Sequence, residues 1–383
     1  MRAVVASIVD PDLPLGGAWT STRGLLEVMR RAGVESEVVH PVERRRAGMG
    51  HDARRAAALA RASVDGLPAK PRFTRSRAFR RDVVARVRTD RPDVVVLNGG
   101  DLLWLVDELP EGAPVVVVEH NLEHRLYLDQ LRALHGPLRI ARRALLRDAR
   151  RLRRFELARL AAAGHAIFLS SADAVRAARS VPGLERIVVP PVFGDGAPPR
   201  PARDVGERLE LLLVANLDWW PNRQALEWLR GNVLPAVGDR ARLHLVGLGA
   251  EKVARADGCI VRHGHVRSLE HVLDSVDVAI GPTVAGGGVS VKVAEMAYRG
   301  MPLLVRPRAL RGLPLGADDA TVALDRASDW VAFLRSEDAR RLARARPNRA
   351  RAEPFTIDRY VAPVARLLES AAGSGGLRGP RRT

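Results

Sequence analysis

Apolar residues along the chain fall into two kinds of stretch. Short runs such as residues 1–9, 114–118 and 277–282 are almost continuously apolar, as are strands that a parallel sheet buries on both faces. Longer stretches between them repeat apolar residues every three or four positions and end at glycine or proline, which predicts helices. Because strands and helices alternate in both halves of the chain, the pattern predicts an α/β fold of two doubly wound, Rossmann-like domains.

The boundary between the two domains is expected at residues 190–206, where five prolines and three glycines interrupt the alternation. A chain of 383 residues suits two domains that each bury a core of their own. We therefore expect a first domain over residues 1–190, a linker over 191–206, a second domain over 207–354, a terminal amphipathic helix over 355–372 and a disordered basic tail over 373–383.

The composition is that of a globular protein, with 46% hydrophobic residues, but its charge is unusual. The formal net charge is +18, and only three of the 62 basic residues are lysine, a bias that GC-rich coding produces. A basic surface favours anionic partners such as nucleotides, anionic lipid or nucleic acid without choosing among them. The single cysteine, Cys259, excludes an internal disulfide. With no signal-peptide pattern and no run of membrane-spanning length, we expect a cytoplasmic protein.

Residues 282–300 contain the strongest candidate for a binding site. A glycine-rich loop opens this stretch, and a helical pattern then begins at Val289 and stops at Gly300. Backbone can approach a ligand closely at glycine, and the unpaired N–H groups of a helix N-terminus attract anions. A lysine can neutralise a phosphate there, and a glutamate three residues on can accept hydrogen bonds from a ribose. The candidates are Gly286, Gly287, Gly288, Lys292 and Glu295, and the alternative is a tight turn with a solvated Lys–Glu pair.

A second group of polar residues follows the apolar run at 114–118. Ligands of open α/β sheets bind beyond the carboxyl ends of the strands, and the polar residues at this place are Glu119, His120, Asn121 and Glu123. For His120 we favour a role in the reaction over the alternative, in which the imidazole only caps neighbouring backbone groups.

The glycine loop and the helix after it resemble the nucleotide-sugar signature of GT-B glycosyltransferases, in particular glycosyltransferase family 4. The family pattern "P…G.G…K..E…..G.P" is matched by Pro282, Gly286, Gly288, Lys292, Glu295, Gly300 and Pro302. Many members have a further glutamate eight positions before the one that Glu295 matches, and Gly287 stands there in this chain. This departure removes one candidate contact to the donor sugar.

The resemblance implies two Rossmann-like domains that face each other across a cleft, with a C-terminal helix that crosses back to the first. His120 would lie at the reaction centre, and Asn121 and Glu123 would lie on the acceptor and sugar side with two loop glycines, Gly16 and Gly17. A plain turn between strand and helix is the alternative for that glycine pair. The turn HGHV resembles a family motif whose backbone, around Val266 here, meets the nucleotide base.

The opening of the second domain resembles a family motif at Asn216, Trp219, Pro221 and Asn222. Many members have a phosphate-binding arginine near this point, and the nearest basic residue here, Arg223, cannot be assigned that role from the sequence. The side chains of Trp219 and Trp220 could pack in the core or line the cleft, and we favour the core, because large aromatic residues are mostly buried.

The expected activity is glycosyl transfer from a nucleoside-diphosphate sugar to a hydroxyl acceptor of unknown identity. N–H groups of Gly287 and Gly288, the helix dipole and Lys292 would stabilise the departing diphosphate, which would remove the need for a metal. The resemblance further implies that the anomeric configuration is retained. Two alternatives remain at this point: a nucleotide-sugar 2-epimerase of the same fold, and a nucleic-acid-binding protein, which rests on net charge alone.

Residues 137–163 form the most basic segment of the chain, with an imperfect apolar stripe among nine arginines. Membrane-associated relatives can place such a helix of the first domain on anionic lipid, which would put the protein on the inner face of a membrane. We favour the alternative, a surface helix with solvated arginines.

Overall fold

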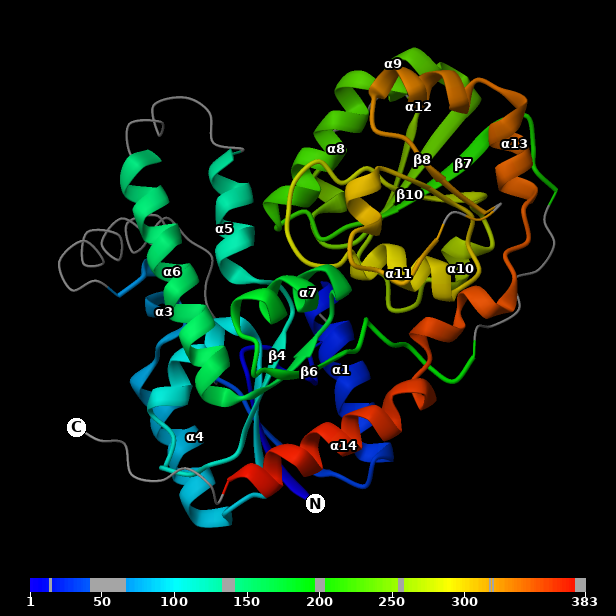
Figure 1. Cartoon of the computed structure of the whole chain (residues 1–383). Coiled ribbons are helices and arrows are strands. Elements are labelled where there is room, and N and C mark those ends of the chain that lie inside the picture. The colour runs from blue at the N-terminus through cyan, green and yellow to red at the C-terminus, as the bar shows by residue number, and fades with distance from the viewer. Residues whose placement is uncertain are drawn as a thin grey trace. The chain divides into compact units, whose positions relative to one another are not determined.

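The computed structural model describes residues 1–13, 16–41, 67–132, 142–196, 204–253, 258–316, 318 and 320–375. The chain divides into two compact units (Figure 1). The first contains Met1–Pro190 together with the chain from Ile357 on, and the second contains Pro191–Thr356. Each unit is built on a parallel sheet with six strands in the described part of the chain, and helices cover the strands. The predicted fold class of two doubly wound α/β units is therefore confirmed.

The sheet of the first unit has the strand order β2-β1-β3-β4-β5-β6, and every pair of neighbours is parallel. Its two central strands, β3 and β4, are buried along their whole length, which explains their unbroken apolar sequences. The strands are β1 (Arg2–Ser7), β2 (Glu35–Val39), β3 (Val94–Asn98), β4 (Val115–Glu119), β5 (His165–Phe168) and β6 (Glu185–Val188).

The helices of the described part of the first unit include one from the end of the chain, which packs against α1 and the sheet. Arg31 of α1 forms an ion pair with Asp358 of this last helix, α14, at 2.8 Å. The expected return of the C-terminal helix to the first unit is thus confirmed. The helices are α1 (Gly16–Arg31), α3 (Ala69–Thr74), α4 (Arg77–Asp90), the 3-10 helix η1 (Gly100–Asp107), α5 (Glu123–Arg132), α6 (Arg142–Ala163), α7 (Ser171–Ser180) and α14 (Asp358–Ser374).

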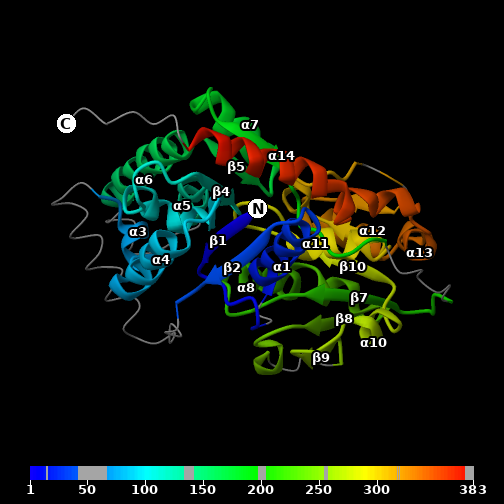
Figure 2. The same cartoon turned by 90° about the horizontal axis from the view of Figure 1, so that it is seen from below.

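The sheet of the second unit has the order β12-β11-β10-β7-β8-β9, again with every neighbouring pair parallel. Figure 2 shows β10, β7, β8 and β9 side by side. The strands are β7 (Leu209–Val214), β8 (Ala241–Val246), β9 (Ile260–Gly264), β10 (Val278–Gly281), β11 (Leu303–Val305) and β12 (Thr321–Ala323).

The helices of the second unit are short apart from α8, which follows β7. In the described residues they are α8 (Trp220–Asn232), α9 (Leu234–Val237), α10 (Glu270–Leu273), α11 (Val291–Tyr298), α12 (Ala327–Leu334) and α13 (Glu337–Arg344), with 3-10 turns η3 (Gly238–Arg240), η4 (Ala250–Lys252), η5 (Pro307–Leu310), η6 (Arg349–Arg351) and η7 (Glu353–Phe355).

Both strand orders contain a point at which the direction of winding reverses. In the first sheet it lies between β1 and β3, and in the second between β7 and β10. The loops that leave neighbouring strands at such a point turn to opposite faces of the sheet, which opens a crevice beyond the carboxyl ends of the strands. The topology alone therefore directs attention to the loops after β1 and β3 in one unit and after β7 and β10 in the other.

The predicted linker, residues 191–206, differs from the structure at its start. Val192 is buried, and the ring of Phe193 packs between Tyr298 and Phe355 of the second unit, with ring centroids 5.3 and 6.4 Å away. Proline and glycine content indicated the linker but could not show these aromatic contacts. Residues 197–203 of the linker, and residues 376–383 of the predicted tail, lie outside the described residues.

The basic segment at 137–163 is described from Arg142 on, as helix α6. Its apolar stripe is turned to the core of the first unit, where Leu152, Phe155 and Leu160 are buried. Two of its acidic residues, Asp148 and Glu156, are buried as well. Among the described residues, no helix has the length and apolar character that crossing a bilayer requires.

Candidate functional site

The glycine loop of the second unit, residues 282–290, follows β10 at the point where the winding reverses. Gly286 has φ +119° and Gly288 has φ +69°, a region that residues with a side chain rarely adopt. A Cβ atom added at Gly286 would lie 3.6 Å from Pro221, an ordinary contact distance, so the backbone angle and not the lack of space requires glycine there. The glycines are therefore needed for the path of the loop, which keeps its backbone close to the loop after β7.

Helix α11 begins at Val291, two residues later than predicted, and Ser290 occupies its N-cap position. A serine at this position usually accepts a hydrogen bond from the first turn of its own helix. The Ser290 hydroxyl makes no such bond, and its oxygen is buried without a partner among the described residues. The hydroxyl and the first N–H groups of α11 are thus available to an anion. Sequence analysis missed Ser290 because it started the helical pattern at Val289, which placed this serine inside the helix and not at its N-cap.

Lys292 lies in the first turn of α11 and is held by a residue of the other loop. Its Nζ donates to Oδ1 of Asn222 at 2.6 Å, and Nδ2 of Asn222 donates to the carbonyl of Asn216 at 2.8 Å. Burial lowers the pKa of Lys292 to about 8, because desolvation disfavours the ammonium form. The structure therefore joins the glycine loop and the β7 loop through a cation that a bound phosphate would stabilise.

Two arginines brace these loops through backbone carbonyls. Arg223 donates to the carbonyls of Leu217 and Asp218 at 2.8 and 2.9 Å, and Arg308 donates to the carbonyl of Gly286 at 3.1 Å. Arg223 thus holds the β7 loop, a role that its place in the sequence did not reveal. Arg308 adds a second positive charge beside the glycine loop, and nothing in its local sequence indicated this contact.

The prediction that Trp219 packs in the core is wrong, because its side chain is 45% exposed. Trp219 is the residue from which α8 starts, at the carboxyl end of β7. The chain leaves the sheet at this place, so the preference of tryptophan for the interior is overridden by its position.

Glu295 and Val266 complete the predicted group in the second unit. Glu295 lies one turn after Lys292, and both of its contacts with Arg299, at 3.1 Å, use the same oxygen, Oε1. Val266 follows β9, an edge strand two positions from β7, after a turn in which Gly264 has φ +67°. The structure therefore groups the glycines, Lys292 and Glu295 after β10. Val266 also lies beyond the carboxyl ends of the strands, after β9.

In the first unit, His120 lies just beyond the carboxyl end of β4 and contacts the residue that ends β3. His120 Nε2 is 2.8 Å from Oδ1 of Asn98, and Nδ2 of Asn98 donates to the hydroxyls of Thr22 and Ser7 at 2.8 and 3.2 Å. Those hydroxyls donate their own protons to the carbonyls of Ala18 and Val9, so they can only accept from the amide.

This network favours the tautomer of His120 that carries its proton on Nε2. Because the Asn98 amide nitrogen must face the two hydroxyls, its oxygen faces the imidazole, and Nε2 of His120 has to carry the proton. Burial lowers the pKa of His120 to about 4, although Asp101 opposes the shift. The imidazole is therefore neutral at physiological pH and presents an unprotonated Nδ1, which can accept a hydrogen bond. Sequence analysis missed Asn98, Thr22 and Ser7.

The other residues predicted for the first unit differ in accessibility. Gly16 and Gly17 are exposed at the start of α1, the helix that supplies Thr22 to the network, and Asn121 is half-buried. The carboxylate of Glu123 is only 6% exposed and is engaged in an ion pair with Lys70. This ion pair holds the Glu123 carboxylate within the first unit, and its role beside the sugar stays a prediction.

Glu119, directly before His120, is 1% exposed, and its carboxyl oxygens have no hydrogen-bond partner among the described residues. Burial raises the pKa of this carboxyl well above its usual value, and the nearby acids Glu156, Asp101 and Asp173 raise it further, while Lys70 opposes them. Burial thus favours the protonated form of Glu119, the residue that directly precedes His120.

Two family models match the chain, and together they cover most of both units. Glycosyltransferase Family 4 matches residues 15–191, and Glycosyl transferases group 1 matches residues 208–334. The chain belongs to the GT-B glycosyltransferases. The glycine loop, Lys292 and Glu295 lie inside the second match, and His120 and Asn98 lie inside the first. The nucleic-acid alternative, which rested on net charge, is superseded by this membership.

Solved structures with the same fold are distant in sequence. HepE of Anabaena, in complex with UDP and glucose, has a TM-score of 0.60 at 11% identity, with 97% of this chain and 100% of that chain covered. WaaG, a glycosyltransferase involved in lipopolysaccharide biosynthesis, has a TM-score of 0.52 at 14% identity, with 97% and 98% covered. TarM has a TM-score of 0.55 at 9% identity. The match covers 74% of the present chain, which spans only 57% of the length of TarM. No curated protein sequence matches the chain.

At the glycine loop, this glycosyltransferase offers the ammonium of Lys292, the guanidinium of Arg308 and backbone N–H groups. In the described part of the chain, no three His, Cys, Asp or Glu side chains are grouped so that they could hold a metal ion. The chemistry that the described groups can supply at this place is stabilisation of negative charge by preorganised donors.

Proposed function

We propose that this glycosyltransferase moves a sugar from a nucleoside-diphosphate sugar to a hydroxyl group, with retention of the anomeric configuration. The observation that carries the proposal is the set of anion-binding groups at the winding reversal between β7 and β10. Two glycines with positive φ, the unpartnered Ser290 hydroxyl, the start of α11 and Lys292 all belong to it. HepE, which has the same fold, is described in complex with UDP and with UDP-glucose.

The hard part of such a transfer is the departure of the nucleoside diphosphate. Negative charge then develops on the phosphate oxygens while the sugar becomes oxocarbenium-like. Donors that are already oriented before the reaction stabilise this charge without reorganisation. We assign this role to the N–H groups of Gly287 and Gly288, to the Ser290 hydroxyl and to the ammonium of Lys292. Because these groups supply the positive charge, we expect the transfer to proceed without a divalent cation.

Within the second unit, we assign Glu295 and the backbone around Val266 to the nucleoside. Arg299 engages one oxygen of Glu295, so the second oxygen, Oε2, can accept hydrogen bonds from the ribose hydroxyls. Backbone groups around Val266 meet the base, a contact that does not depend on the side chain. This arrangement binds the nucleotide while leaving the bond to the sugar accessible.

The transferred sugar is oriented by His120 of the first unit. The neutral imidazole accepts a hydrogen bond from a sugar hydroxyl at Nδ1, because Asn98 holds the proton on Nε2. Gly16, Gly17 and Asn121 lie on the acceptor side. The proton of the acceptor hydroxyl passes to the departing phosphate as the new glycosidic bond forms on the same face, which retains the configuration. The acceptor is a hydroxyl of a saccharide, a lipid-linked molecule or a secondary metabolite.

Calorimetric titration with UDP and GDP tests the donor site. We expect one of the two to bind wild-type protein and to bind at least about tenfold more weakly to Lys292→Ala and to Glu295→Ala, since each loses a charge-assisted contact. His120→Ala is the matched control in the other unit: it should keep the affinity for the nucleotide but lose turnover. Unchanged nucleotide binding in both second-unit variants would overturn the placement of the site.

A product assay separates transfer from the epimerase alternative. The enzyme is incubated with the nucleotide sugar that gives the largest rise in melting temperature, with and without candidate acceptors. We expect release of nucleoside diphosphate and a glycosylated acceptor. A C2 epimer of the donor, formed without any acceptor, would instead show a 2-epimerase.

A further inference from the structure

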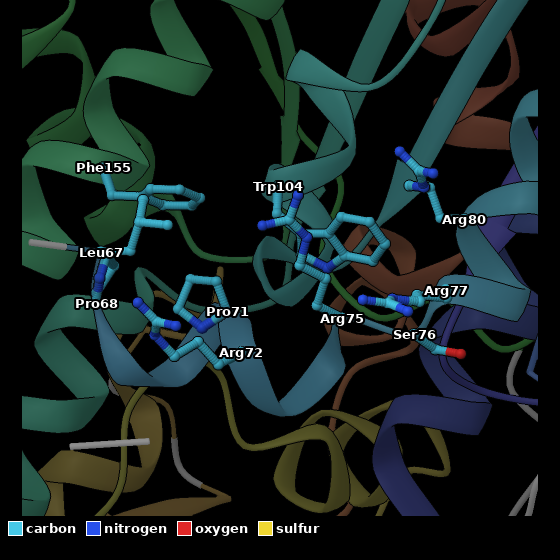
Figure 3. A pocket seen from close by; sticks show the side chains of 10 residues that line it. All are labelled: Leu67, Pro68, Pro71, Arg72, Arg75, Ser76, Arg77, Arg80, Trp104 and Phe155. Atoms are coloured by element: carbon cyan, nitrogen blue, oxygen red, sulfur yellow. The ribbon is translucent and has the colours of Figure 1, made fainter. Parts of the chain in front are cut away.

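The first unit contains a cavity that none of the residues assigned to the transfer lines (Figure 3). Its volume is about 550 Å³, which lies within the range of small-molecule sites. Its walls come from the chain between Leu67 and Arg80, from η1 and from α6. The lining residues are Leu67, Pro68, Pro71, Arg72, Arg75, Ser76, Arg77, Arg80, Trp104 and Phe155.

The charged part of this cavity is entirely cationic. Four of its lining residues are arginines and none is acidic. Arg75 and Arg80 both pair with the carboxylate of Glu108, Arg80 at 2.8 Å, so one negative charge orients two guanidinium groups and leaves an excess of one positive charge. Arg77 is exposed and has no ion-pair partner among the described residues, which adds a further positive charge.

Apart from Ser76, the rest of the lining is apolar, and it includes a buried donor without a partner among the described residues. Leu67 is 40% exposed at the cavity, while Trp104 and Phe155 are almost completely buried beside it. The indole Nε1 of Trp104 has no hydrogen-bond partner in the part of the chain that the structure describes. A buried N–H without an acceptor is destabilising. An acceptor atom of a ligand in the cavity would remove this cost.

We propose that this cavity binds a small phosphate ester with an apolar body, in addition to the donor nucleotide. Guanidinium groups match phosphate oxygens in geometry and can each donate two hydrogen bonds. Phosphate is favoured over carboxylate because its three terminal oxygens can engage several donors from different walls of the cavity. The apolar body occupies the side formed by Leu67, Pro68 and Pro71. The inference does not depend on the proposed transfer, because its site shares no residue with the donor site.

The test is calorimetric titration of the full chain, without donor, with 1-naphthyl phosphate, 1-naphthol and inorganic phosphate. We expect 1-naphthyl phosphate to bind at least tenfold more tightly than either fragment, because only the ester uses both parts of the cavity. Arg77→Ala should weaken its binding by about tenfold, the loss typical of one charge-assisted hydrogen bond. Trp104→Phe, which removes the N–H and keeps an aromatic ring, should weaken it several-fold. Melting temperatures report whether each variant is folded.

Arg179→Ala is the matched control, since Arg179 is an exposed arginine of α7 that does not line the cavity. It should leave the affinity for 1-naphthyl phosphate unchanged, and Arg77→Ala should leave UDP or GDP binding unchanged. The proposal is overturned if the ester binds no more tightly than its fragments, or if Arg179→Ala weakens binding as much as Arg77→Ala. Sedimentation with phosphatidic acid vesicles identifies the source: vesicle binding that Arg77→Ala abolishes indicates a lipid headgroup, and its absence beside ester binding indicates a free metabolite.

Discussion

Replacing Asn98 by aspartate should move the proton equilibrium of His120 without touching any group of the donor site. In the wild-type protein the neutral amide oxygen of Asn98 faces Nε2 of His120 at 2.8 Å. Burial lowers the pKa of His120 to about 4, and it outweighs the charge of Asp101, which favours the imidazolium form. A carboxylate in place of the amide oxygen would put a full negative charge against the ring.

An opposite charge at hydrogen-bonding distance raises the pKa of a histidine by about 1–3 units, most where water is excluded. In Asn98→Asp the pKa of His120 should therefore rise from about 4 into the range of about 5–7. Protonation occupies Nδ1 and removes the acceptor that we assign to the sugar hydroxyl. The acid limb of the pH profile of kcat should therefore move to higher pH together with the pKa of His120. The variant loses activity as pH falls through the new pKa, whereas the wild-type enzyme loses activity only near pH 4.

The pKa is measured by NMR titration of labelled imidazoles, with His120→Gln identifying the signal, and kcat is measured over the same pH range. Asn232→Asp serves as the matched control, because Asn232 is exposed on α8 and its amide only contacts a carbonyl of its own helix. It should shift neither quantity. If the His120 pKa in Asn98→Asp stays within half a unit of wild type, or if it rises while the acid limb of kcat does not follow, the assigned tautomer or its role is wrong.

Further predictions concern the glycine loop. Ser290→Ala should weaken UDP or GDP binding several-fold in calorimetry but leave the melting temperature unchanged or higher, because it removes a buried hydroxyl that has no partner in the described structure. Gly286→Ala should lower the free energy of unfolding by about 1–2 kcal/mol in denaturant titrations, because alanine is strained at φ +119°. Nucleotide affinity should fall as pH rises through about 8, where Lys292 loses its charge in the free enzyme, and Lys292→Ala should remove this dependence. Transfer should persist in excess EDTA, and its complete loss with recovery on adding Mg²⁺ would contradict the metal-independent proposal.

The grouping of the candidate donor-site residues in the second unit could be predicted largely from the sequence, because the features that group them are local. Gly286 and Gly288 are needed for backbone angles that few other residues adopt, and Lys292 follows on the same helix, so spacing alone groups them. Asn222 is 70 positions from Lys292, and only the strand order that places β7 beside β10 brings it to the ammonium group. The alternation of strands and helices predicted the fold class, but it contains no information about that order.

The first-unit network shows the same limit more clearly. Ser7, Thr22 and Asn98 belong to β1, α1 and β3, and each is a small polar residue of a kind that occurs throughout the chain. Their significance comes from being buried together against His120, which no single segment reveals. Glu123 illustrates the same limit: its motif context predicted a role beside the sugar, but nothing in that context showed that Lys70, more than fifty positions earlier, pairs with its carboxylate.

The large positive charge of the chain becomes less puzzling once individual arginines are followed to their partners. Arg223 and Arg308 donate to carbonyls of the loops around the glycine site, and Arg75 and Arg80 share one carboxylate. Such arginines hold backbone carbonyls and carboxylates within their own unit. The net charge of the chain therefore does not indicate how many arginines contact a ligand. The group that we assign to the departing phosphate is instead one of only three lysines in the sequence. A compact ammonium on a flexible chain can lose its hydration shell to one amide oxygen and a phosphate, whereas a planar guanidinium needs several acceptors around it. In a chain in which arginine replaces lysine almost everywhere, a half-buried lysine at this point is what the chemistry of the site requires.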